Sequence, residues 1–175
     1  MRANARSEGG FLLVELTVAM VIITTSLLAL MAAYSASFSS IHSSARSSAA
    51  GQLTENQLEL YASLPYASIG LDTSTLATKK ASDANYNTDE TALPGSGTDV
   101  TISGCGASAQ CSPVQTLTGS DGKSYKVETF IRSLTNNSDA SWSEKVVTVI
   151  VRDLATTGYP KVMTAQTAFD HGPAS

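Results

Sequence analysis

The chain has 175 residues, which is enough for one modest domain with an appended segment. Its net charge of −4 and charged fraction of 15 % indicate a mildly acidic, solvated surface. Its basic residues are scattered singly, apart from the pair Lys79-Lys80. A nucleic-acid-binding surface needs clustered Lys and Arg, so the composition excludes a strongly basic domain of that class.

The first predicted element is an apolar helix at 11–34, in which Glu15 is the only ionisable residue apart from tyrosine. About 20 apolar residues are enough to span a bilayer as a helix. The short tail before this stretch carries Arg2 and Arg6, and no basic residue follows until Arg46. The positive-inside rule therefore predicts a single-pass protein with a cytoplasmic N-terminus and an extracytoplasmic remainder.

Two ordinary explanations of this stretch leave something unexplained. A secretory signal peptide does not account for the length of this stretch, because its apolar core has only about 7–15 residues before a cleavage site of small residues. A signal anchor has the right length, but it does not account for Glu15, because a lone carboxylate in a membrane costs roughly 2.5–3.5 kcal/mol and usually has a partner.

The sequence GFLLVE at 10–15 resembles the processing site of type IV pilins and of their relatives, the type II secretion pseudopilins and the competence pilins. This resemblance is specific, but it is confined to the N-terminal segment. The resemblance of the later strands to those of minor pilins is much weaker. It implies that residues 1–10 are a leader, which a membrane-embedded prepilin peptidase removes after Gly10. The same enzyme would then methylate the new N-terminal amine of Phe11.

The resemblance also gives Glu15 a role, as the acid that pairs with the N-terminal amine of a neighbouring subunit while a filament grows. Opposite charges attract strongly in a low dielectric, whereas an unpaired charge remains costly. Ala32 stands where many major pilins carry a helix-bending proline, and Thr24 where glycine is common. These departures favour a minor or accessory pilin over the major filament subunit.

The segment 35–64 is predicted to continue the helix in amphipathic form, and Pro65 to end it. Apolar residues recur there at helical spacing, which marks one face that a domain must cover. That face consists of Phe38, Ile41, Ala45, Ala49, Leu53, Leu60 and Leu64.

The segment 65–98 is rich in Ser, Thr, Asp and Asn and shows little periodicity, so we expect a variable surface loop region. Two interpretations of this loop stay open. It is either a hydrophilic flap or a surface that binds a partner or an adhesive target.

The segment 99–175 is predicted to form a small antiparallel β-sheet head, with a tight turn at 120–122. The expected strands are 99–103, 124–134, 145–154 and 161–169. The expected core or rim residues are Phe130, Trp142, Val147, Val149 and Val151. The fold class is therefore α+β, a long N-terminal helical spine packed against a small antiparallel sheet.

Two cysteines, Cys105 and Cys111, lie close together in a loop-like stretch without CxxC spacing or a nearby histidine. In an exported head, a disulfide that closes a small loop is the favoured interpretation, and a zinc site is not. His42 and His171 are far apart and suggest no catalytic triad. We expect no enzyme activity, no metal and no cofactor.

Together these observations predict a prepilin-like subunit that assembles into a type IV pilus. Its expected partners are the prepilin peptidase, other pilin subunits in a helical filament, the cytoplasmic membrane and the pilus assembly platform, with no clear nucleic-acid site. A type II secretion pseudopilin and a competence pilin remain alternatives. A signal-anchored extracellular binding module that never polymerises is the alternative from another class.

Overall fold

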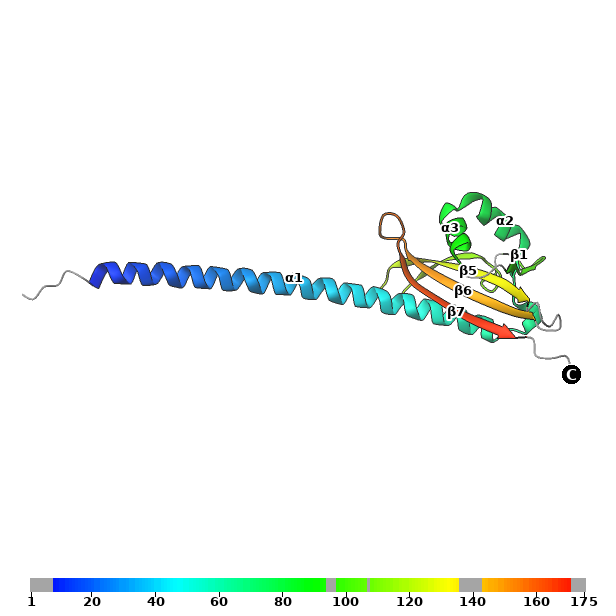
Figure 1. Ribbon diagram of the computed structural model, residues 1–175, viewed down its shortest axis with the longest axis horizontal. Helices are drawn as coiled ribbons and strands as arrows, with labels where there is room; N and C mark the ends of the chain where they lie inside the picture. The colour runs from blue at the N-terminus through cyan, green and yellow to red at the C-terminus, as the bar shows by residue number, and fades with distance from the viewer. Residues whose placement is uncertain (1–7, 94–96, 107, 136–142, 171–175) are drawn as a thin grey trace, which may run out of the picture. The chain divides into compact units, whose positions relative to one another are not determined.

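The computed structural model describes residues 8–93, 97–106, 108–135 and 143–170 (Figure 1), and for residues 8–12, 135 and 143 it describes the backbone alone. The chain divides into two compact units, Met1–Ser44 and Ala45–Ser175. The described part of the first unit is helical, and the second unit contains the sheet.

One helix, α1, runs from Glu8 to Ala62. The sequence contains no proline before Pro65, so nothing interrupts the helical hydrogen bonds, and the helix ends shortly before that residue, as predicted. The helix begins earlier than the expected Phe11. Its part at 13–62 is long and apolar enough to cross a membrane by length and composition.

The second unit contains a five-stranded antiparallel sheet, so the predicted α+β class is confirmed. The strand order is β2-β5-β6-β7, and β4 also pairs with β5. A separate pair, β1 and β3, is parallel. The strands are β1 (Leu71–Asp72), β2 (Thr98–Asp99), β3 (Thr101–Ile102), β4 (Val114–Thr118), β5 (Ser124–Thr135), β6 (Ser143–Asp153) and β7 (Lys161–Asp170).

Three of the predicted strands correspond to β5, β6 and β7, whereas the short strand expected at 99–103 is divided between β2 and β3. The sequence analysis missed β4, which is short and half polar. The tight turn at 120–122 is confirmed, because Gly122 has a positive φ of 76° and donates its N–H to the carbonyl of Gly119. Trp142 lies outside the described residues.

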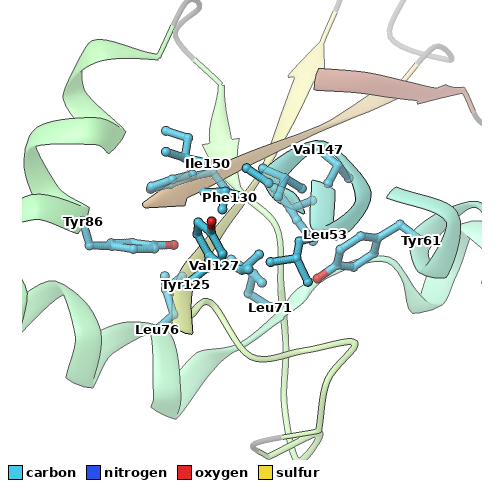
Figure 2. Packing of buried hydrophobic residues seen from close by; sticks show 14 of the residues in the cluster. Leu53, Tyr61, Leu71, Leu76, Tyr86, Tyr125, Val127, Phe130, Val147 and Ile150 are labelled. Carbon is cyan, nitrogen blue, oxygen red and sulfur yellow. The ribbon is translucent and has the colours of Figure 1, made fainter. Parts of the chain in front are cut away.

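One face of the sheet packs against the part of α1 that belongs to the second unit. Val147 and Val149 of β6 are fully buried there, together with Ala49 and Tyr61 of α1. The helix approaches closely where its side chains are small, and a Cβ placed at Gly51 would lie 3.5 Å from the methyl carbon of Met163. Figure 2 shows the core in which Leu53 and Tyr61 meet the sheet residues.

The opposite face of the sheet is covered by two helices, so the prediction of a loop at 65–98 is wrong. A short 3₁₀ helix (Tyr66–Ser68) is followed by β1, α2 (Thr73–Ser82) and α3 (Ala84–Ala92). Figure 1 shows α2 and α3 on the side of the sheet away from α1.

A few side chains attach these helices to the sheet. Leu76 of α2 and Tyr86 of α3 are buried. The ring of Tyr86 stacks on Phe130 with 4.4 Å between centroids, and its hydroxyl donates to the carbonyl of Thr129 at 3.0 Å. The segment is therefore a packed layer of the fold and not a flap over it.

Aspartate caps explain why this polar segment is helical. The carboxylate of Asp72 accepts from the backbone N–H groups of Ser74 and Thr75, and that of Asp83 accepts from the N–H of Tyr86. Each helix buries only one or two side chains, so the apolar period is too sparse to recognise. The two aspartates were the available signal, because Asp is a strongly preferred N-cap residue.

Candidate functional site

The segment GFLLVE at 10–15, which resembles a processing site in sequence, lies at the start of α1. The backbones of Gly10 and Phe11 lie in its first turn, and the side chain of Phe11 is outside the described part of the structure. Two adjacent glycines, Gly9 and Gly10, each cost about 1 kcal/mol in a helix, and helix ends fray. This turn is therefore easy to unwind, which is what a protease that binds an extended chain requires.

Beyond this turn the helix is apolar on all sides. From Leu13 to Met31 the large hydrophobic side chains are between 51 % and 73 % exposed within the chain. A soluble helix would show one polar face instead. This surface is suited to lipid or to other apolar helices.

The hydroxyl groups in this stretch are satisfied by the helix itself. Thr24 and Thr25 donate to carbonyls three and four residues earlier, and Ser26 donates to the carbonyl of Ile22 at 2.7 Å. Such bonds from Ser and Thr side chains to carbonyls of the preceding turn are common in helices. They consequently add no unsatisfied donor to the apolar surface.

Glu15 is the exception on this surface. It is exposed, and it makes no ion pair with any residue that the structure describes. The nearest basic residue that follows it in the sequence is Arg46. A carboxylate on an apolar helix is costly unless it is paired, and none of the residues described in the structure pairs with Glu15.

The head contains a buried charge cluster that the sequence did not reveal. Arg152 of β6 donates to Glu128 of β5 at 3.0 Å and also contacts Asp89 of α3. Lys126 contacts Glu128 at 2.7 Å and Asp83. The side chains of Glu128 and Asp89 are 0 % and 1 % exposed.

The pKa values of the two buried carboxyl groups move in opposite directions. Burial raises the pKa of Glu128 more than its bonds to Lys126 and Arg152 lower it. Burial also acts on Asp89, but hydrogen bonds from Lys161 and Arg152 outweigh it and hold the pKa of Asp89 below its ordinary value. The cluster attaches α3 to the sheet, so we assign it a structural role.

The predicted disulfide between Cys105 and Cys111 is present. Its loop is fastened to the start of α2, because the backbone N–H of Asp72 donates to the carbonyl of Cys111 at 2.9 Å. The N–H of Gly106 donates to the carboxylate of Asp72 at 3.0 Å. Hydrogen bonds from the Ser74 hydroxyl, from the backbone of Thr75 and from Gly106 lower the pKa of Asp72.

Replacing both Cys105 and Cys111 by Ser should destabilise the head by about 2 kcal/mol, the entropy expected for so short a loop. Urea unfolding of the two proteins, followed by circular dichroism, measures the difference. Treating the wild-type protein with a reductant should reproduce the loss and should leave the Ser variant unchanged. Equal unfolding midpoints would show that the loop does not stabilise the head.

Neither a metal centre nor a known relative identifies the site. Within the described residues, no group of three or more His, Cys, Asp and Glu side chains is arranged to hold a metal ion. Comparison with protein families, curated proteins and solved structures found no match to this chain. The residues at the start of α1 therefore remain as the candidate functional site.

Proposed function

We propose that this chain is a prepilin-like subunit of a type IV filament, and that it acts as a minor or accessory pilin. In this proposal the leader 1–10 is removed after Gly10, Phe11 is methylated, and the helix then leaves the membrane to join a bundle of identical or related helices. The observation that carries the proposal is Glu15, an exposed carboxylate on an apolar helix, five residues after Gly10, which makes no ion pair with the residues that the structure describes.

Cleavage after Gly10 would supply the charge that Glu15 lacks. The new terminus at Phe11 is an amine, which stays positively charged after one methylation. An isolated carboxylate and an isolated amine are each costly in an apolar environment, and together they offset this cost. A subunit whose amine lies beside the Glu15 of its neighbour is therefore favoured over one displaced along the bundle axis.

The placement of the two units follows from the same proposal. The apolar part of α1 is inserted with its N-terminus in the cytoplasm, as the positions of Arg2, Arg6 and Arg46 favour. The head is then extracytoplasmic, where the disulfide Cys105–Cys111 is stable. The partners in this proposal are the prepilin peptidase, the assembly platform in the cytoplasmic membrane and other pilin subunits.

The proposal is tested by finding where the chain resides in its own cells. Filaments are sheared from the surface and sedimented, and the chain is measured in that fraction and in the membranes. We expect it in the filament fraction of wild-type cells and in the membranes of cells without prepilin peptidase. A chain that stays in the membranes of filament-bearing wild-type cells would support the signal-anchored binding module instead.

The same fractionation separates the alternatives within the family. Loss of the chain from the filament fraction when the pilus assembly ATPase is deleted would support the pilus. Dependence on the type II secretion ATPase would support a pseudopilin, and dependence on the competence system would support a competence pilin.

A further inference from the structure

Strand β7 forms a free edge of the sheet. Among the described residues it pairs with β6 on one side, and the strand order ends with it. It is ten residues long, and its only charged residues, Lys161 and Asp170, stand at its two ends. Edge strands are usually protected by interior charges, proline, bulges or shortness. The pairing of β7 with β6 is irregular only near its start, opposite Val151 and Arg152, so from Met163 onward β7 presents a regular row of backbone donors and acceptors.

A groove lies between this strand and α1, which run side by side in the head (Figure 1). Its volume is about 400 Å³. Part of its lining is apolar and part is acidic or polar. The lining residues are Glu55, Asn56, Leu58, Glu59, Ala62, Thr167 and Phe169.

Two carboxylates line the α1 side of this groove. Glu55 and Glu59 are exposed and make no ion pair within the described part of the chain. They are four residues apart on α1, so they lie on the same side of the helix and repel one another. A cation placed between them or beside them relieves this repulsion.

The spacing of these groups fits an added strand. Positions four apart on a helix are separated by about 6 Å along its axis, and alternate residues of a strand by about 6.6 Å. Alternate side chains of a strand placed beside β7 would face the groove, two of them opposite Glu55 and Glu59. A third would lie on the apolar surface of Phe169.

We propose that the free edge of β7 and this groove bind an extended segment of another protein, added to the sheet as a strand. The segment carries two basic side chains at alternate positions toward Glu55 and Glu59, and an apolar side chain toward Phe169. Main-chain hydrogen bonds to β7 supply affinity, and the groove supplies specificity. This inference is independent of leader cleavage and of polymerisation.

A second copy of this chain does not supply such a segment. Most of its basic side chains in the described part of the head are held by carboxylates or carbonyls of the same chain. Lys79 lies on α2 and Lys123 in the tight turn before β5. Arg2 and Arg6 precede the apolar span, and the segments 94–96, 136–142 and 171–175 contain no Lys or Arg.

The test uses the full-length chain in detergent micelles and two fluorescein-labelled peptides, TVTKTKT and its reverse TKTKTVT. In each peptide valine and two lysines share one face of a strand, and the two orders allow either strand direction. Fluorescence anisotropy should show saturable binding of at least one of them. The variant with both Glu55→Gln and Glu59→Gln should bind that peptide about tenfold more weakly or worse.

Matched controls separate strand addition from simple charge attraction. Glu144→Gln, on the opposite face of the sheet, should leave binding unchanged, and Phe169→Ala should weaken it. A peptide with alternate backbone nitrogens methylated keeps its charge but cannot pair with β7, and it should not bind.

Three binding results would overturn the proposal. They are the absence of saturable binding by either peptide, equal binding by the variant with both glutamates replaced, and equal binding by the methylated peptide. Self-association of the chain that the peptide displaces would identify a second copy as the occupant, and would likewise contradict it.

Discussion

Replacing Glu15 by Gln should lower incorporation of the chain into filaments by about a hundredfold while leaving the chain in the membrane. The amide has nearly the same shape as the carboxylate but carries no charge. The neighbour's amine would then be left without a partner in an apolar bundle, which costs about 3 kcal/mol or more. Each 1.4 kcal/mol changes an equilibrium constant by about a factor of ten, so a cost of about 3 kcal/mol lowers incorporation by about a hundredfold.

The measurement is the ratio of the chain in the sheared-filament fraction to the chain in the membrane. Thr17→Val is a matched control on the same helix, because the Thr17 hydroxyl donates to the carbonyl of Val14 and serves no partner outside the helix. Its ratio should equal that of the wild type. If Glu15→Gln also assembles at the wild-type ratio, the electrostatic account of Glu15 is wrong.

Replacing Arg152 by Leu should destabilise the head by about 3–5 kcal/mol. The guanidinium contacts Glu128 and Asp89 and donates to the carbonyl of Tyr159 at 2.7 Å. Its loss leaves two buried carboxyl groups short of positive charge, and an uncompensated buried charge is among the most costly defects in a protein. Denaturant unfolding monitored by tyrosine fluorescence measures the change.

Two further variants show whether the cost comes from the unpaired charge. Adding Glu128→Leu to Arg152→Leu removes one of the two carboxylates that lost the guanidinium as a partner, and it should recover part of the stability. Lys161→Gln should cost less than about 1 kcal/mol, because the Lys161 side chain is 43 % exposed. An Arg152→Leu protein as stable as the wild type would show that the cluster does not hold α3 to the sheet.

The loss in free energy of unfolding caused by Arg152→Leu should become smaller as the pH falls. Burial already raises the pKa of Glu128. Removing the Arg152 guanidinium, one of the groups that lower this pKa, raises it further, so the folded state takes up a proton at Glu128 more readily than the unfolded chain does. Stability that depends on a raised pKa is present at low pH and is lost as the pH rises. In the wild type, Asp83 and Asp89 have lowered pKa values and contribute in the opposite sense, above their unfolded value of about 3.8.

The sequence predicted the elements that carry long, uninterrupted patterns. The apolar stretch at 11–34 and the β-branched runs that became β5 and β6 were recognisable because each repeats over many residues. The disulfide Cys105–Cys111 followed from spacing and from the expected compartment. Helices α2 and α3 were missed because they bury few residues and expose the rest.

The sequence of the strand at 145–154 nevertheless indicated that a second layer, now seen to be α2 and α3, covers the sheet. Its sequence VVTVIV at 146–151 is apolar at five of six positions and does not alternate with polar residues, and a strand of that kind is covered on both faces. Glu128 and Arg152 could not be recognised as a buried pair, because Asp89 comes from a segment that the composition indicated to be a loop.

The intact mass and N-terminal sequence of the chain isolated from its own cells test the central claim most directly. The account predicts a chain that begins at Phe11, lacks residues 1–10 and carries one added methyl group at its N-terminus. A full-length chain, beginning at Met1 in cells with an active prepilin peptidase, would contradict it.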